Sequence, residues 1–233
     1  MDTLIHTPDD ARLKADVIVT CCALAQRGLT YGTSGNVSVR RDSETFFISP
    51  TGVPYEQLDD IPIMDVAGHW YGRRRPSSEW RFHRDILKAR PDVNAIVHTH
   101  SKHAVALACT GQGIPAFHYM VAVAGGADIR CAPYASFGSQ ALSDHAMAAL
   151  KDRKACLLAN HGVIALGTDL SSALRLAGEV ENLAAQYCAA LSVGKPVLLN
   201  DAEMARVLEQ FRTYGKQDST HDPDLVFAGT ERP

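Results

Sequence analysis

The chain has 233 residues, of which 46% are hydrophobic and 21% are charged, and its formal net charge is -3. This length predicts one domain with a substantial core. The small net charge gives no reason to expect nucleic acid or an anionic membrane surface as a partner. The amino-terminal segment has no basic stretch followed by an apolar one, and no window approaches the roughly 18 apolar residues of a membrane span. We therefore expect a cytoplasmic protein that acts on a small molecule.

Helical and strand patterns follow one another in mixed order. In chain order, they predict a helix over 7–28, strands over 36–40 and 45–49, a loop over 52–62, a helix over 76–90, a strand over 92–100, a helix over 101–111, a loop over 124–138, a helix over 139–153, two short apolar runs within 154–167, a long helix after 169 and a helix from 200 to 215.

The order of these elements predicts an α/β fold. The early hairpin and the mixture of strands and helices favour a central, mainly antiparallel sheet flanked by helices. We expect a single domain over residues 1–215. The polar tail over 216–233 is expected to be loosely ordered unless a neighbouring subunit holds it.

The six cysteines are scattered and include no CxxC pair. Most of them lie in apolar helical or strand patterns, which is typical of reduced, buried thiols rather than of a disulfide framework. The spacing also excludes a zinc ribbon. Any metal site must therefore be built from histidine and carboxylate.

A pair of histidines closes the predicted strand "DVNAIVHTH". Because side chains alternate along a strand, His98 and His100 point the same way and Thr99 points oppositely. Two imidazoles at this spacing can hold one metal ion. Hydrogen-bonded histidines in a core or on a surface are the alternative reading of an isolated pair.

A third candidate ligand is His161, at the break between two apolar runs in "LLANHGVIAL". Gly162 can take a positive φ there, which would let the chain turn so that the imidazole projects from a strand end. A plain turn histidine is the alternative. Of the other histidines, His118 is ambiguous, and ordinary polar positions are expected for His69, His83, His103 and His145.

Three polar segments could bind an anion. In "RPSSEWRFHRDI", Ser77, Ser78 and Glu79 are predicted in the first turn of a helix, where they could simply cap it or could help to form a phosphate site. Three arginines, 73–75, lie just upstream. The segments 30–39 and 49–56 offer further hydroxyl, carboxamide and glycine groups, although each could be only a turn.

Eight segments together resemble one known family. They are "GTSGNVSVR", "SPTGVPYEQL", "PSSEWRFH", "VHTHSKH", "IPAFHYMVAVAGG", "CAPYASFG", "ANHGVIAL" and "FRTYG". In their order and spacing they resemble the class II aldolases of the fuculose-phosphate aldolase type, within the aldolase/epimerase/adducin superfamily. The resemblance runs from about residue 12 to 215.

The resemblance implies a homotetramer of fourfold symmetry and a specific set of site residues. It implies a zinc ion, or another divalent ion such as Mn²⁺ or Co²⁺, held by His98, His100, His161 and Glu79. It implies a phosphate pocket made by Asn36, Thr51, Gly52, Ser77 and Ser78, with Thr33 nearby. Two catalytic tyrosines are implied as well, Tyr119 from the neighbouring subunit as a proton donor and Tyr214 closing over the site.

The activity implied by the resemblance is a retro-aldol cleavage. The substrate would be a (deoxy)ketose 1-phosphate such as L-fuculose 1-phosphate or 5-deoxyribulose 1-phosphate, and the products would be dihydroxyacetone phosphate and an aldehyde. The metal would stabilise an enediolate as a Lewis acid, and Glu79 would move protons.

Three alternatives stay open at this point. One is a 5-methylthioribulose-1-phosphate aldolase or dehydratase, which would use the same histidines. Another is a pentulose-phosphate 4-epimerase, although such enzymes have a "THADY"-like segment where this chain has "FHYMVAV". The third is a non-catalytic interaction module like adducin, which the presence of all three histidines with Glu79 disfavours.

Overall fold

The structure, a computed structural model, describes residues 8–212. Its helices are α1 (Pro8–Gln26), α2 (Trp80–Ala89), α3 (Lys102–Ala108), α4 (Gln140–Ala149), α5 (Leu170–Val193) and α6 (Asp201–Phe211), with 3₁₀ helices η1 (Tyr55–Gln57) and η2 (Tyr119–Ala124). Its strands are β1 (Asn36–Arg40), β2 (Thr45–Ile48), β3 (Ile63–Asp65), β4 (Trp70–Tyr71), β5 (Ala95–Thr99), β6 (Arg130–Ala132), β7 (Ala155–Leu158) and β8 (Gly162–Gly167).

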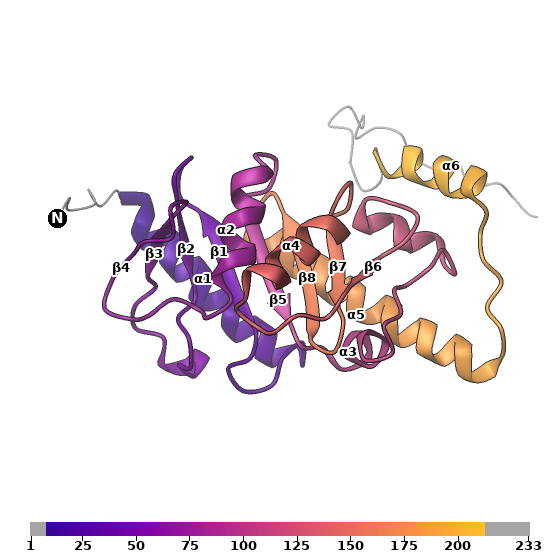
Figure 1. Cartoon of the computed structure of the whole chain (residues 1–233), viewed down its shortest axis with the longest axis horizontal. Coiled ribbons are helices and arrows are strands. Elements are labelled where there is room, and N and C mark those ends of the chain that lie inside the picture. The colour runs from indigo at the N-terminus through magenta and orange to yellow at the C-terminus, as the bar shows by residue number, and fades with distance from the viewer. Residues whose placement is uncertain (1–7, 213–233) are drawn as a thin grey trace, which may run out of the picture.

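The eight strands form one sheet in the order β4-β3-β2-β1-β5-β8-β7-β6 (Figure 1). Every neighbouring pair is antiparallel except β6 and β7, which are parallel. The predicted α/β fold with a mainly antiparallel sheet is therefore confirmed. Strands β1, β5 and β8 lie at the centre of this sheet, so the segments that carry Asn36 and His98 are neighbours although they are far apart in sequence.

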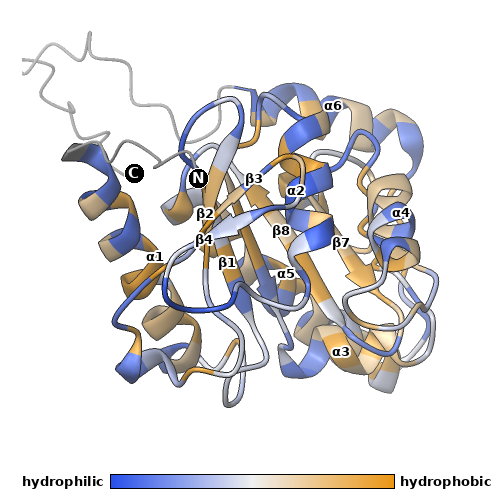
Figure 2. Ribbon diagram, turned by 60° about the vertical axis from the view of Figure 1, so that its left-hand side comes forward, coloured by the Kyte–Doolittle hydropathy of each residue, from blue (hydrophilic) through white to orange (hydrophobic). Residues whose placement is uncertain are grey.

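Helices cover both faces of the sheet and give the fold three layers. Buried residues of α1, α3 and α5 pack on one face, and those of α2 and α4 pack on the other. The strands supply alternate residues to these two cores: Val37, Val39, Val97 and Ala165 face the first, and Ile48, Ile96, Ile164 and Leu166 face the second. Figure 2 shows hydrophobic residues along the strands between the helices.

The long helix α5 is the main cover of one face, and its buried side matches the sequence pattern. Asp169 caps its first turn and accepts the backbone N–H of Ser172. The residues predicted to point inward are all buried; they are Leu170, Leu174, Ala177, Val180, Leu183 and Tyr187. Burial of such an apolar stripe, rather than helix propensity alone, is what stabilises a helix in a folded domain.

The structure corrects two predicted loops. The segment 124–138 contains strand β6, and the segment 52–62 contains the short helix η1. Both elements are only three residues long. Strand β6 depends on hydrogen bonding to β7, which lies more than twenty residues later, so its own sequence carries little periodic signal.

Two further predictions concern the carboxy-terminal end of the chain and the absence of a membrane span. The predicted end of the last helix at residue 215 and the polar tail 216–233 lie outside the described residues, so the domain boundary at 215 stays a prediction. Within residues 8–212, no helix combines the length and the hydropathy that a membrane span needs.

Candidate metal centre

The centre of the site is His98, which lies in the middle strand β5. Its side chain is fully buried, and its backbone position is opposite Asn36 of β1 and Ile164 of β8. The ring nitrogen Nδ1 lies 2.8 Å from the carbonyl oxygen of Val163. Because a carbonyl oxygen only accepts, Nδ1 carries the hydrogen, and Nε2 is the ring nitrogen that faces the site.

His100 follows the end of β5 and faces the same way as His98, as the alternation of the strand predicts. The Nε2 atoms of the two rings are 2.9 Å apart. Burial, together with the neighbouring imidazoles of His98 and His161, lowers the pKa of His100 to about 3. The ring is therefore neutral at physiological pH, which is the state that binds a metal ion.

His161 lies in the turn between β7 and β8, and its ring centroid is 4.9 Å from those of both His98 and His100. The prediction that Gly162 takes a positive φ is wrong, because Asn160 is the residue in the left-handed region, with φ of 54°. Gly162 is needed for a different reason. A Cβ at this position would clash with the carbonyl oxygen of Thr99 and lie 2.8 Å from the ring of His100.

Substitution of Gly162 tests this close approach. We expect Gly162→Ala to lower the free energy of unfolding by about 1–3 kcal/mol, the usual cost of overpacking a core, and to weaken metal binding because the histidine strand must shift. Gly178→Ala in α5 is the matched control, since nothing lies within 4 Å of its Cβ position. That control should stabilise the protein by about 0.5–1 kcal/mol. Urea unfolding measures the free energy of unfolding of both variants. Equal effects of the two substitutions would contradict the conclusion that Gly162 is required for close packing against Thr99 and His100.

The fourth member of the cluster is Glu79, the residue immediately before α2. Its Oε2 lies 3.1 Å from Nε2 of His98, and its Oε1 lies 3.1 Å from Nε2 of His161. The side chain is almost completely buried. Burial by itself raises the pKa of Glu79, but the imidazoles of His98 and His161 outweigh burial and hold this pKa well below its ordinary value.

The donor atoms of these four residues fit a divalent cation. All four ligand atoms lie within 4.8 Å of one another. Ring nitrogens of three histidines and a carboxylate converge on one point, and the buried Oε1 of Glu79 makes no hydrogen bond. A buried, unsatisfied carboxylate oxygen is costly. A metal ion bound between these atoms would remove that cost, and three histidines with one carboxylate are ligands that zinc accepts.

The polar segment before α2 is extended up to Ser77 and then forms a turn at Ser78 and Glu79. Its backbone pairs with the segment after β2: the N–H of Ser77 donates to the carbonyl of Ser49 at 3.0 Å, and the N–H of Thr51 donates to that of Arg75 at 3.1 Å. The predicted helix over 76–90 therefore begins later, at Trp80. This pairing brings residues 49–51 beside residues 75–78, which local sequence patterns cannot predict.

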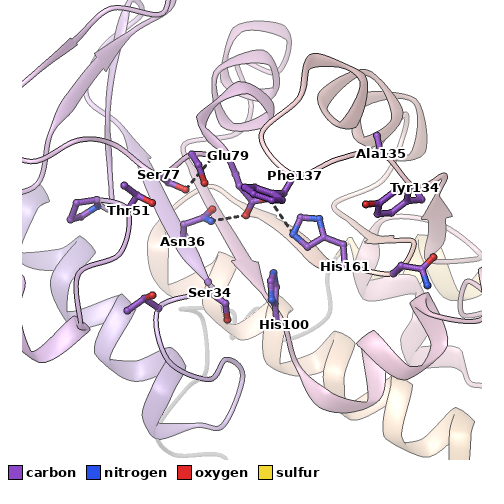
Figure 3. A pocket seen from close by; sticks show the side chains of 15 residues that line it. Ser34, Asn36, Thr51, Ser77, Glu79, His100, Tyr134, Ala135, Phe137 and His161 are labelled. Atoms are coloured by element: carbon purple, nitrogen blue, oxygen red, sulfur yellow. Dashed lines mark hydrogen bonds and ion pairs between the residues drawn. The ribbon is translucent and has the colours of Figure 1, made fainter.

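A cleft with a volume of about 300 Å³ opens beside the cluster. The residues that line it are Thr33, Ser34, Gly35, Asn36, Pro50, Thr51, Ser77, Ser78, Glu79, His100, Tyr134, Ala135, Phe137, Asn160 and His161. Figure 3 shows Thr51, Ser77, Asn36 and Ser34 at one end and Tyr134 and Ala135 at the other, with His100 and His161 between them. The cleft therefore has a hydroxyl-rich end, a metal-binding centre and an aromatic end.

Most of the candidate residues from the sequence line this cleft, and four do not. His98 is fully buried behind the cleft lining, although it belongs to the cluster. Gly52 lies in the adjoining turn with a positive φ of 69° but does not line the cleft. Tyr119 begins η2, is 46% exposed and does not line the cleft of its own chain. Tyr214 lies outside the described residues.

Two of the three arginines upstream of Ser77 make ion pairs away from the cleft. Arg73 and Arg74 form ion pairs with Asp59 at the surface. No arginine or lysine is among the described residues that line the cleft. An anion there would be held by hydroxyl and backbone N–H groups.

The sequence interpretation missed several residues of the site. Tyr134 and Phe137 are 61% and 73% exposed and line the cleft; aromatic residues in a glycine-rich segment were the available signal. His83, expected at an ordinary polar position, is fully buried and hydrogen bonded to Asn36. Nothing in the helical pattern of its segment distinguishes it from a surface histidine.

Comparison with known proteins finds relatives over most of the chain. A protein of Rhodospirillum rubrum named 5-methylthioribulose-1-phosphate/5-deoxyribulose-1-phosphate aldolase is 54% identical over 198 residues, which are 84% of this chain and 89% of the relative. The L-fuculose phosphate aldolase of Escherichia coli is 49% identical over 208 residues, which are 88% of this chain and 96% of the relative.

Structural similarity leads to the same group of proteins. A solved structure of L-fuculose 1-phosphate aldolase superposes with a TM-score of 0.84 at 40% sequence identity, covering 89% of this chain and 98% of that chain. The family described as Class II Aldolase and Adducin N-terminal domain matches residues 15–188. Since the match spans the sheet, the clustered histidines and Glu79, the chain belongs to the class II aldolase and adducin family.

Proposed function

We propose that this protein is a metal-dependent class II aldolase that cleaves a (deoxy)ketose 1-phosphate to dihydroxyacetone phosphate and an aldehyde. The observation that carries the proposal is the position of the Glu79 and histidine cluster midway along the cleft, between its hydroxyl-rich and aromatic ends. The names of the relatives, 5-deoxyribulose-1-phosphate and L-fuculose phosphate aldolases, support the same substrate class.

The hydroxyl-rich end of the cleft is suited to the phosphate group. Hydroxyls of Thr33, Thr51, Ser77 and Ser78 line it, and the amino-terminal end of α2 adds a favourable dipole for an anion. The amide of Asn36 lies between this end and Glu79, to which it donates at 3.0 Å. Binding the phosphate here, away from the bond that breaks, would fix the orientation of the substrate.

The metal cluster and Glu79 supply the chemistry at the centre. His98, His100, His161 and Glu79 would hold the divalent ion, zinc in our proposal, and this ion would stabilise negative charge that develops on substrate oxygens. Glu79 is buried and close to the reacting part of the cleft. Its carboxylate can accept a proton from a substrate hydroxyl and return it to carbon, which is general acid–base catalysis.

The aromatic end of the cleft would bind the aldehyde half of the substrate. Tyr134 and Ala135 line this end, and their aromatic ring and methyl group suit a short deoxygenated chain better than a polar one. Each methylene that differs between substrates changes the discrimination by roughly 1–3 kcal/mol. A panel of ketose 1-phosphates, with the products identified by NMR, would test the assignment: an aldehyde product supports cleavage, whereas an epimerised or dehydrated sugar phosphate would replace it with one of the alternative reactions.

Tyr119 is proposed to act at the cleft of a neighbouring subunit in a fourfold homotetramer. It is 46% exposed and does not line the cleft of its own chain, while Phe117 and Met120 beside it are only partly buried. Exposed aromatic groups next to apolar residues are typical of an interface. A head-to-tail ring would bring this surface to a different surface of the next chain.

Mixing two inactive variants tests the action of Tyr119 across subunits. We expect Tyr119→Phe and His98→Ala to be inactive separately and to regain activity when their subunits exchange, because some boundaries then combine an intact metal site with an intact tyrosine. Activity is measured as aldehyde release after exchange, which mass spectrometry of the mixed oligomers verifies. Verified exchange without recovery, or an active monomer, would contradict the proposal.

A further inference from the structure

His83 is a fully buried titratable group that the proposed mechanism does not use. It lies on α2, one helical turn after Glu79, so the two side chains emerge on the same side of the helix. Its side chain is fully buried and stacks on Phe82, with ring centroids 4.6 Å apart. Burial of a histidine at this depth requires that both ring nitrogens find partners.

Both partners of His83 come from strand β1. Its Nε2 lies 2.6 Å from Oδ1 of Asn36, and its Nδ1 lies 2.7 Å from the hydroxyl of Ser38. Asn36 in turn donates from Nδ2 to Oε2 of Glu79 at 3.0 Å. A continuous chain of three hydrogen bonds therefore connects Ser38 to the carboxylate of Glu79.

The direction of each hydrogen bond follows from the carboxylate at the end of the chain. A carboxylate only accepts, so Asn36 must present its amide N–H to Glu79 and its oxygen to His83. That oxygen requires a hydrogen on Nε2 of the imidazole. Nδ1 then carries the lone pair and accepts from the hydroxyl of Ser38, so every group is satisfied in one arrangement.

The sheet register and the burial of His83 maintain this arrangement. Asn36 and Ser38 are two residues apart on β1 and face the same side, and Asn36 is opposite the ligand His98 on β5. Burial lowers the pKa of His83 to about 3. The imidazole therefore stays neutral and keeps its acceptor toward Ser38.

We propose that His83 is a positioning residue of the metal centre: it holds the amide of Asn36 with its N–H toward Glu79, and Asn36 thereby fixes the carboxylate against His98 and His161. Without His83, Oδ1 of Asn36 would lose its hydrogen-bond donor, and only the carboxylate of Glu79 would still hold the amide in place. This inference rests on the proposed metal site, because a fixed carboxylate matters for holding the ion and for moving protons. Partners of metal ligands commonly change metal affinity or activity by about 10–100-fold.

The test compares three variants. His83→Leu removes the donor, His83→Gln keeps an amide N–H that can reach Asn36, and Ser143→Ala is the matched control. Ser143 is also fully buried beside α2, but its hydroxyl donates to Asp85 at 2.6 Å and has no connection to the cleft. Zinc affinity is measured by competition with a chromophoric chelator, and kcat and KM are measured separately.

The three variants are expected to differ in zinc affinity and in kcat. His83→Leu should weaken zinc binding and lower kcat by about 10–100-fold, with little change in KM for the sugar phosphate. His83→Gln should recover most of both values, and Ser143→Ala should keep both while lowering only the melting temperature. In an Asn36→Ala background, His83→Leu should add little, because the two residues act in series.

A measurement on the unmodified protein keeps the inference testable even if His83→Leu does not fold. The ¹⁵N chemical shifts of the His83 ring should show hydrogen on Nε2 and a lone pair on Nδ1. The opposite tautomer, or a His83→Leu variant that binds zinc as tightly as the unmodified protein, would overturn the inference. Failure of the unmodified protein to bind zinc would instead overturn the proposed metal site itself.

Discussion

Removal of the divalent ion is expected to abolish the activity of this protein while leaving its fold intact. A bound metal that stabilises developing charge contributes several kcal/mol to the lowering of the barrier, so the loss should be at least about a thousandfold in kcat. The two hydrophobic cores contain none of the four residues of the cluster. The fold therefore does not depend on the ion in the way that a zinc finger does.

The measurement combines activity with two structural controls. After chelation, far-UV circular dichroism should be unchanged, and the melting temperature should fall only by the contribution of the lost ligand. Addition of one equivalent of Zn²⁺ per subunit should restore activity. Full turnover by metal-depleted protein would contradict the proposed mechanism. Global unfolding on chelation would contradict the conclusion that the hydrophobic cores fold without the ion.

The second large effect is expected for Glu79→Gln. Replacing the carboxylate with an amide keeps the shape but removes the group that accepts and returns a proton, so kcat should fall by about 10²–10⁴-fold. Binding of dihydroxyacetone phosphate should change far less, because the proposed phosphate contacts at Thr51, Ser77 and Ser78 are untouched. Isothermal titration with zinc present in excess separates the two quantities.

A matched control is available elsewhere in the chain. Glu181 accepts backbone N–H groups of His103 and Ala104 at the start of α3, at 2.9 and 3.0 Å, and does not line the cleft. Glu181→Gln should therefore keep kcat within a few-fold of the unmodified protein. If Glu79→Gln behaves like this control, Glu79 has no role in proton transfer.

Much of the fold could be predicted because its signals are local. The stripe of α5, the cap at Asp169 and the alternation in β1, β2 and β5 are set by residues close in sequence. Strands β3, β4 and β6 were harder to predict because they are two or three residues long and exist only through pairing with partners. Too few residues repeat in such strands to give a periodic pattern.

The residues of the site also differ in whether local sequence or tertiary contacts determine their positions. The shared direction of His98 and His100 follows from strand alternation, and the structure confirms it. The approach of Glu79 and His161 is tertiary, and only the resemblance to a family could place them together. His83 was misjudged because its partners, Asn36 and Ser38, lie 47 and 45 residues earlier and reach it only through the sheet.

The central claim is that this chain breaks a carbon–carbon bond of a ketose 1-phosphate at its histidine and Glu79 cluster. The most direct test is coupled detection of dihydroxyacetone phosphate released from L-fuculose 1-phosphate, 5-deoxyribulose 1-phosphate and 5-methylthioribulose 1-phosphate, with zinc-loaded, zinc-stripped and His98→Ala protein side by side. We predict release from at least one of these substrates by the zinc-loaded protein and none by the other two preparations. Absence of dihydroxyacetone phosphate with all three substrates, from folded and zinc-loaded protein, would contradict the claim.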